Sequence, residues 1–266
     1  MPQERAEDVQ LRKRTKAQAA RHDRANVKPR GYDLGKFPPY AVTVDIVIFT
    51  VSSGVLEVLL VERSDDPYAA WWALPGGFKR EGESLDDAAR RELGEETAVN
   101  RPGHLEQLGA YGDPGRDARG NIVTVAYVAA TPEVGEIEAG GDAAGAGLAP
   151  VRDVLDRKRD LAFDHSRIVA DAYERMARDL ETTDLATRFT GPHFTLTELR
   201  SVFEAVWFTT LDPTNFRRTL RDGKVQWVEE TAERAASTPR GGRPPEIYVP
   251  TGAWSHGPPL RRPRPS

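Results

Sequence analysis

The sequence contains no cysteine, two methionines and five histidines among its 266 residues. The absence of cysteine excludes a disulfide framework, thiol chemistry and cysteine-ligated zinc. No apolar run approaches the roughly 20 residues that a membrane-spanning helix needs, and the N-terminus lacks the apolar core of a secretory signal. We therefore expect a cytoplasmic protein with no membrane partner. The histidines show no spacing typical of metal ligands; they are His22, His104, His165, His193 and His256.

The chain also lacks a strong charge imbalance, because its formal net charge is only -4. A nucleic-acid partner therefore cannot be inferred from the overall charge, and any basic surface must be local. The length and the 39% hydrophobic content are sufficient for two modest domains. Residues 1–36 are polar and partly basic, and residues 253–266 are rich in proline and arginine. We predict that both tails are disordered, with a basic DNA-binding arm as the alternative for the first.

A glycine loop followed by an acidic helix is the most informative stretch. Gly76-Gly77 precedes the loop, and the helix carries Glu92, Glu95 and Glu96 on one face, with neighbouring Cβ atoms roughly 5–6 Å apart. Like charges at that distance repel, so their grouping favours a cation between them, and carboxylate oxygens suit Mg²⁺ or Mn²⁺. Taken alone, these glutamates are more typical of a solvated acidic helix face.

The complete string around these glutamates resembles the Nudix box. It runs from Gly77 over five residues to Glu83, then over seven residues to Arg91-Glu92-Leu93, and ends with Glu95-Glu96 and Ala98-Val99. The resemblance implies an α/β/α sandwich that holds a nucleoside diphosphate linked to another moiety. It also implies that Glu92, Glu95 and Glu96 bind a divalent metal, that Glu83 supports them, and that Arg91 ties the loop by a salt bridge.

Ala98 stands where the Nudix family has glycine. A residue just past a helix often takes the left-handed conformation, which costs a residue with a Cβ roughly 1 kcal/mol. The fold tolerates this cost, but a shifted loop would weaken catalysis. If the protein is active, Glu92, Glu83 and Arg91 are the catalytic candidates. Some hydrolases of the Nudix family draw a catalytic base from the region that resembles the later loop with Glu133, Glu136 and Glu138, and the sequence selects none of the three.

Apolar segments around the box predict a sheet. Residues 40–51 are rich in β-branched side chains and predict a strand, and the turn at 52–54 leads into a hairpin partner at 55–61. Another strand is predicted at 121–130. Residues 164–181 have apolar side chains at steps of four, which predicts an amphipathic helix that begins at an Asp164 N-cap.

The loop at residues 112–120 contains two arginines, Arg116 and Arg119. An arginine can hold a phosphate by two parallel hydrogen bonds, yet an ordinary polar β-turn explains the same residues about equally well. The motif from Gly112 to Asp117 resembles the ADP-ribose branch of the Nudix family and its regulatory relatives. That resemblance implies that Gly77, Arg116 and Arg119 contact ADP-ribose or a related ligand.

Residues 194–223 predict two short helices joined by a tight turn, the helix-turn-helix pattern. Thr195 and Glu198 form a capping box before the first helix. Asp212-Pro213 provides an N-cap and a first-turn proline for the second helix, and Asp222-Gly223 provides its stop.

The second of these helices has a polar outer face. Phe216 and Leu220 share the buried face, so Arg218 points away from it. In this position of the pair the helix would present polar side chains to base edges and phosphates, although exposed arginines are more often only solubilising. Strands predicted at 225–228 and 246–249 flank a basic loop and complete a winged helix. The predicted DNA-binding residues are Thr214, Asn215, Arg217, Arg218, Arg221, Arg240 and Arg243.

Both halves together resemble the Nudix-related transcriptional regulators of NAD metabolism. The C-terminal motifs that carry the resemblance are Phe194-Thr195-Leu196-Thr197-Glu198-Leu199, Leu211-Asp212, Asn215-Phe216-Arg217-Arg218 and Gly241-Gly242-Arg243-Pro244. The resemblance implies a dimeric repressor of NAD-metabolism genes. Its Nudix-like domain, residues 37–182, would sense ADP-ribose or a related NAD product and release operator DNA from a winged-helix domain at residues 189–252.

Two alternatives stay open at this point. One is a Mg²⁺-dependent ADP-ribose pyrophosphatase with an accessory winged helix, in which the metal on Glu92, Glu95 and Glu96 polarises the pyrophosphate and activates water. The other is a nucleotide-binding adaptor whose winged helix contacts protein. The sequence leaves undecided whether the carboxylates hydrolyse a ligand, only bind one, or do neither.

Overall fold

The structure is a computed structural model that describes residues 33–96, 104–134, 143–221, 227–235, 244–252 and 260–263. It divides into two units, one up to Pro39 and one from Tyr40 onward. In the first unit Asp33 accepts a hydrogen bond from the Gly35 amide and caps a short 3-10 helix, η1 (Leu34–Lys36). This local cap corrects the prediction of disorder for the last residues of 1–36; the remainder of that prediction lies outside the described residues.

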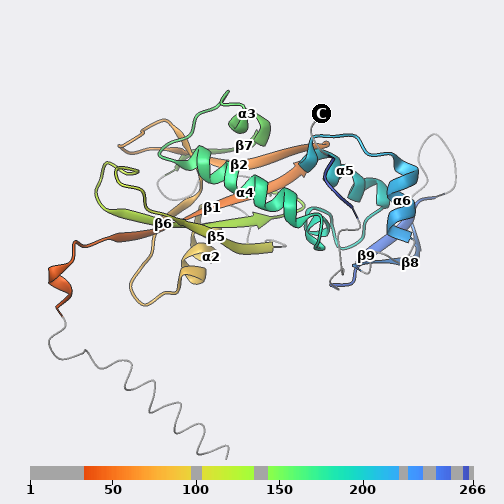
Figure 1. Cartoon of the computed structure of the whole chain (residues 1–266), viewed down its shortest axis with the longest axis horizontal. Coiled ribbons are helices and arrows are strands. Elements are labelled where there is room, and N and C mark those ends of the chain that lie inside the picture. The colour runs from red at the N-terminus through yellow and green to blue at the C-terminus, as the bar shows by residue number, and fades with distance from the viewer. Residues whose placement is uncertain are drawn as a thin grey trace, which may run out of the picture. The chain divides into compact units, whose positions relative to one another are not determined.

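A seven-stranded sheet forms the centre of the second unit (Figure 1). β1 forms the predicted hairpin with β2, pairs in parallel with β6, and also pairs with the short β4. β5 pairs with β6, while β3 and β7 pair with β2. The strands are β1 (Ala41–Ser52), β2 (Val55–Arg63), β3 (Trp72–Ala73), β4 (Gly76–Phe78), β5 (His104–Tyr111), β6 (Ile122–Ala130) and β7 (Ala143–Pro150).

Helices cover both faces of this sheet, because side chains alternate along its central strand. Ile46 and Ile48 of β1 belong to the apolar cluster that contains Ala88, Ala89 and Leu93 of α2 (Leu85–Glu96). Val47 and Phe49 belong to the other cluster, with α3 (Val151–Leu155) and α4 (His165–Asp179). Figure 1 shows α2 and α4 on opposite sides of the sheet. The predicted α/β/α sandwich is confirmed.

The helix predicted at 164–181 is α4, and its apolar positions Ile168, Ala172 and Met176 are buried as expected. Asp164 occupies the N-cap position, but its side chain makes no capping hydrogen bond. It instead accepts two hydrogen bonds from Arg116. Two parallel hydrogen bonds between oppositely charged groups are stronger than one hydrogen bond from a neutral backbone amide, so the predicted capping role of the side chain is wrong.

The C-terminal half contains the predicted helix-turn-helix. Its elements are η2 (Leu185–Phe189), α5 (Leu196–Trp207), α6 (Pro213–Arg221), β8 (Val228–Arg234) and β9 (Glu246–Pro250). The capping box of Thr195 and Glu198 is present at the start of α5. The Asn215 amide donates to Asp212 Oδ1 over 2.8 Å at the start of α6. Both local predictions are confirmed.

The first strand of the wing lies later than predicted. It was expected at 225–228, but β8 spans Val228–Arg234. Five of its seven residues are exposed and three are glutamates, so it lacks the apolar alternation that identifies a half-buried strand. The predicted helix stop at Asp222-Gly223 and the wing tip with Arg240 and Arg243 lie outside the described residues.

One apolar cluster extends from the sheet into the helix-turn-helix. Leu180 and Leu185, on either side of the connection, are buried in it, and Trp207 Nε1 donates to Ala177 O over 2.9 Å. The domain limits 37–182 and 189–252 stay a prediction. Part of the C-terminal tail is ordered, contrary to expectation, because Arg262 pairs with Glu174 and donates to the hydroxyl of Tyr173.

No helix in the described part of the chain has the length and apolar character to cross a lipid bilayer.

Candidate functional site

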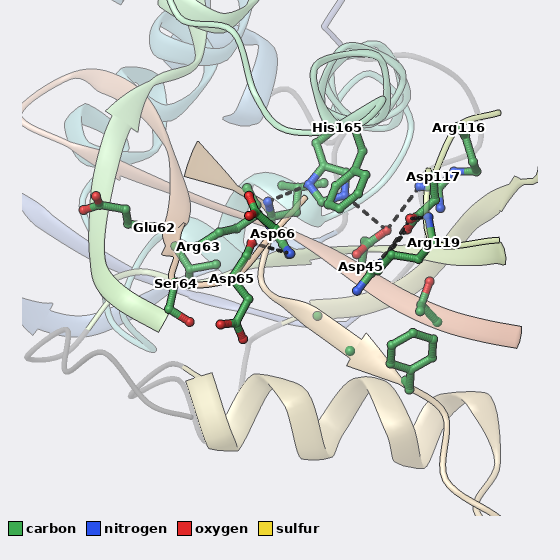
Figure 2. Close-up of a pocket in the computed structure, with 18 residues that line it drawn as sticks. Asp45, Glu62, Arg63, Ser64, Asp65, Asp66, Arg116, Asp117, Arg119 and His165 are labelled. Carbon is green, nitrogen blue, oxygen red and sulfur yellow. Dashed lines mark hydrogen bonds and ion pairs between the residues drawn. The ribbon is translucent and has the colours of Figure 1, made fainter. Parts of the chain in front are cut away.

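A pocket of about 290 Å³ opens on the α4 side of the sheet (Figure 2). Its walls come from the start of β1, the end of β2, the glycine loop at β4, the loop between β5 and β6, and the start of α4. Gly77, Arg116 and Arg119, the three residues predicted to bind a ligand, all line it. Five segments of the chain therefore meet at one cavity.

The floor of this pocket is a network of buried charges centred on Arg116. Arg116 Nε and Nη2 donate to Asp164 Oδ2 and Oδ1 at 3.0 and 2.6 Å. Arg116 Nη2 also lies 3.8 Å from Asp45 Oδ2, and the Arg116 side chain is only 5% exposed. A buried cation is stable only when compensated, so two carboxylates of the protein already neutralise the guanidinium that was predicted to hold phosphate.

His165 completes the network, and no sequence signal had singled it out. Its Nδ1 accepts a hydrogen bond from the Leu74 amide at 2.9 Å, and its Nε2 lies 3.6 Å from Asp45 Oδ2. Complete burial lowers the pKa of His165. The imidazole is therefore neutral near pH 7, and its proton is on Nε2, facing the carboxylate.

Two more arginines lie at the rim, both close to the same aromatic ring. The Cζ atoms of Arg63 and Arg119 lie 4.9 and 5.3 Å from the centroid of Phe163, within cation–π range. Arg119 also pairs with Asp117 at 2.7 Å. Arg63 donates to two backbone carbonyl oxygens, those of Pro67 and Asp65.

Sequence reasoning missed Arg63 as a site residue. Burial, followed by the nearby charge of Arg119, lowers the pKa of its guanidinium, which stays cationic. The hydrogen bonds described above go from Arg63 to neutral carbonyl groups and not to carboxylates. The signal that would have found it is its place at the end of β2, directly before the segment that leads into the glycine loop.

Arg91 ties the glycine loop to α2, as the Nudix resemblance implied. Its Nε and Nη2 donate to Glu83 at 3.1 and 2.8 Å, and Nη2 also donates to Phe78 O. Its Nη1 donates to Glu92 at 2.6 Å and to Glu95 at 3.1 Å. All five donors of the guanidinium are therefore used. The hydrogen bonds from Arg91 and from the Arg80 amide lower the pKa of Glu83 to about 2.

Of the carboxylates predicted to bind metal, Glu92 adjoins the pocket only through Gly77, and neither Glu92 nor Glu95 is among the residues that line it. Glu92 is buried, which raises its pKa, and a Cβ placed on Gly77 would lie 2.3 Å from its Oε1. Glu95 is half-exposed, and the side chain of Glu96 lies outside the described residues. No group of three metal-ligating side chains occurs among the residues that are described. The donor chemistry of Glu92 and Glu95 fits Mg²⁺, with Arg91 now placed between them.

Helix α6 presents the predicted polar face. Thr214, Asn215, Arg217 and Arg218 are exposed, and Phe216 is buried beneath them. Arg218 Nη2 donates to Asn215 Oδ1 at 2.9 Å. Within the described ranges neither Arg217 nor Arg218 pairs with a carboxylate, so two cations of this face are available to an anionic partner.

Arg221, at the end of α6, differs from the other predicted DNA-binding residues. Its Nη2 pairs with Glu246 at 2.6 Å and with Glu230 at 3.3 Å, and its Nε donates to the Tyr248 hydroxyl. The guanidinium therefore contacts the wing, whereas Arg218 contacts Asn215 of its own helix. The predicted DNA-binding role of Arg221 stays a prediction.

Comparison with known families agrees with both halves of the fold. The NUDIX domain model matches residues 39–172, and the model of the NrtR DNA-binding winged helix domain matches residues 188–249. The protein class is thus a Nudix domain joined to a winged-helix DNA-binding domain.

Relatives narrow this class to a family. The chain is 35% identical over 219 residues to the ADPR responsive transcriptional repressor NtrR of Acinetobacter baylyi, covering 82% of this chain and 84% of the relative. The structure of Shewanella oneidensis NrtR complexed with a 27mer DNA is 31% identical, with a TM-score of 0.69, and the match covers 82% of this chain and 98% of that chain. The NUDIX domain of the same NrtR complexed with ADP ribose is 40% identical, with a TM-score of 0.50, over 55% and 94%. The chain belongs to the NrtR family of Nudix-related transcriptional regulators.

Proposed function

We propose that this protein is a transcriptional repressor that binds duplex DNA through α6 and releases it when ADP-ribose, or a related NAD product, occupies the Nudix pocket. The observation that carries the proposal is the outer face of α6, where Asn215, Arg217 and Arg218 are exposed. Arginine can read guanine edges and asparagine adenine edges, and both residues also contact phosphate. The relatives named above are a repressor responsive to ADP-ribose and a protein crystallised with DNA, which supports DNA binding and a response to ADP-ribose. NAD-metabolism genes are the proposed targets, because ADP-ribose is a product of NAD.

In the pocket, Arg63 and Arg119 are the groups suited to a diphosphate. Both lie at the rim, and Arg63 makes its hydrogen bonds to carbonyl oxygens, which a phosphate can replace. Arg116 instead holds the loop to α4 through Asp164. An anionic ligand would therefore contact Arg63 and Arg119 at the rim, while Arg116 and its carboxylate partner hold the segments that line the pocket together.

The start of α4 lies at the pocket and its end lies at the winged helix. Asp164 and His165 are at its beginning, and Ala177 O, near its end, accepts the hydrogen bond from Trp207 of α5. A helix of 15 residues spans about 22 Å at 1.5 Å per residue. We infer that a ligand acts on DNA binding through this rigid element, because it contacts both sites.

A divalent cation stays part of the proposal. Glu92, Glu95 and Glu96 would hold Mg²⁺ or Mn²⁺, which supplies Lewis-acid polarisation of a phosphoryl oxygen when bound. The chain's own contribution is to hold Glu92 against Gly77 and to fix the loop through Arg91 and Glu83.

We also propose that the repressor is a homodimer. Two recognition helices on duplex DNA read half-sites about one helical turn, roughly 34 Å, apart. Light scattering after size exclusion should give twice the chain mass of 29.4 kDa; a monomer at operator-saturating concentration would contradict this part.

The experiment that tests the function is fluorescence anisotropy on duplex DNA from upstream of the protein's own gene and of NAD-synthesis genes. We expect selective binding that ADP-ribose weakens, with a scrambled duplex and AMP as controls. Weak binding that ignores ADP-ribose, together with hydrolysis of ADP-ribose in Mg²⁺, would instead establish the pyrophosphatase alternative.

A further inference from the structure

The wing of the DNA-binding half is acidic on the side that adjoins α6. β8 carries Glu229, Glu230 and Glu233, and β9 begins with Glu246. Carboxylates repel the phosphates of DNA, so a wing with this composition requires compensation if it is to lie near a duplex. Within the described residues Arg234 pairs with Glu230 at 3.4 Å, and Arg221 of α6 pairs with Glu230 and Glu246.

Arg221 is the last described residue of α6, and it reaches both strands of the wing. Its Nη2 lies 2.6 Å from Glu246 Oε2 of β9 and 3.3 Å from Glu230 Oε2 of β8. Its Nε donates to the hydroxyl of Tyr248, which itself donates to Glu230. One guanidinium therefore joins the end of the helix to both strands.

The pair with Glu246 is more than a surface contact. The Glu246 side chain is 11% exposed, whereas Arg221 is 41% exposed. A carboxylate that is mostly removed from water depends strongly on its partner, because an unpaired buried charge is costly. The buried Tyr248 ring lies in the same apolar cluster as Phe216 and Leu220. The ion pair therefore adjoins well-packed apolar side chains.

We propose that Arg221 is a positioning residue for DNA binding: it holds the wing against the end of α6 and neutralises Glu230 and Glu246, and it makes no phosphate contact itself. Its fixed pairing sets the spacing at which the helix and the wing meet the duplex together. The inference rests on the proposed DNA-binding function and divides its arginines into two roles, with Arg217 and Arg218 as direct contacts and Arg221 as the support.

The salt dependence of operator binding distinguishes these roles. Each phosphate contact that is lost reduces the slope of log K against log salt by about one. The double variant Arg221→Gln/Glu246→Gln removes one positive and one negative charge, so the net charge of the wing is unchanged. It can restore the interface through a neutral hydrogen bond between the two amides, but it cannot restore a phosphate contact.

The test measures operator affinity at several salt concentrations for the wild type, Arg221→Gln, the double variant, and Arg217→Ala as the matched control from the same helix. We expect Arg221→Gln to lose affinity on the order of tenfold, and the double variant to recover most of it with the wild-type slope. Arg217→Ala should lose a slope of about one.

The inference is overturned if Arg221→Gln binds as tightly as the wild type, or if the double variant stays weak with a slope reduced like that of Arg217→Ala. ADP-ribose affinity and the circular dichroism spectrum at the assay temperature should be the same for all variants, which shows that each folds. Arg221→Gln alone should unfold at a lower temperature, because it leaves the mostly buried Glu246 without this partner. A wild type without salt-sensitive DNA binding would contradict the proposed function itself, and that outcome is separate because it does not depend on Arg221.

Discussion

The pocket and the recognition helix α6 both carry several arginines, but they differ in whether the arginine charge is paired within the protein or exposed to solvent. Arg116 in the pocket is 5% exposed and lies between Asp164 and Asp45. Arg217 and Arg218 on α6 are exposed, and neither pairs with a carboxylate in the described ranges. A buried cation is stable only beside a counter-charge from the protein itself, whereas an exposed cation stays hydrated until it binds an anionic partner.

This difference separates arginines that organise the protein from arginines that contact a partner. Arg116 and Arg119 had the same predicted role, yet Arg116 connects the loop to α4 while Arg119 lies at the rim beside Phe163. Arg221 and Arg218 also had the same predicted role, yet Arg221 pairs with Glu230 and Glu246 while Arg218 donates to Asn215. Variants that remove one kind of arginine should therefore affect folding, and variants that remove the other should affect binding.

The largest effect is expected for Arg116→Ala. The variant leaves Asp45 and Asp164 in the pocket floor without their partner, and breaking such a buried pair typically costs about 3–5 kcal/mol of unfolding free energy. Arg167→Ala is the matched control, because its pair with Asp113 is exposed on both sides and should contribute little to the unfolding free energy. Urea denaturation measures both; equal losses would contradict the organising role of Arg116.

Gly77→Ala should have the next largest effect, because Gly77 lines the same pocket and adjoins the Glu92 carboxylate. A Cβ there would lie 2.3 Å from Glu92 Oε1 and 2.7 Å from its Cδ, so the carboxylate must move at a cost of about 1–3 kcal/mol. We expect weaker ADP-ribose binding by calorimetry as well as lower stability. Gly109→Ala, with no heavy atom within 4 Å, is the control. Unchanged ligand affinity in Gly77→Ala would separate Glu92 from the ligand site.

Arg218→Ala tests the exposed arginines of the recognition helix, in contrast to the buried arginine of the pocket. It should weaken operator binding by 10- to 100-fold, about 1–3 kcal/mol for one base-reading contact. Thermal unfolding and ADP-ribose affinity should not change, since no ion pair of the fold is lost. Arg90→Ala, an exposed arginine of α2, removes the same charge elsewhere. An operator affinity that is equal in the two variants would exclude Arg218 from the recognition face.

The smallest effect is a pH dependence from the pocket floor. Burial lowers the pKa of His165 below its unfolded value, so the unfolded chain takes up the proton first. Stability is therefore complete above about pH 6.5 and falls by up to roughly 1.4 kcal/mol per pH unit below it, until the folded pKa is reached.

The measurement is denaturation of the wild type and His165→Asn between pH 5.5 and 8. The asparagine oxygen can still accept from the Leu74 amide. His104 titrates in the same direction, because burial also lowers its pKa, so the difference between the two proteins isolates His165. Glu83, with a pKa of about 2, contributes only at lower pH. Parallel pH curves would show that His165 is not the titrating group.

Much of the fold was predictable because its signals are local. The Thr195–Glu198 capping box, the Asp212 cap and the buried positions of α6 depend only on residues within one or two turns of each other. β7 was not predicted, because residues 143–150 are mostly alanine and glycine and the strand is held by its pairing with β2. Strand propensity in such a segment is weak, and the neighbouring strand decides.

The sequence by itself determined the two-part architecture, the box carboxylates and the helix face that carries Arg218, since periodicity and motif spacing survive in one dimension. Only the tertiary structure decided which arginines remain available. Asp164 is 48 residues from Arg116, and Glu246 is 25 residues from Arg221. The local sequence around either arginine therefore does not predict its partner. Ion pairs are made between side chains that folding brings together, so the distinction between a binding arginine and a supporting one exists only in three dimensions.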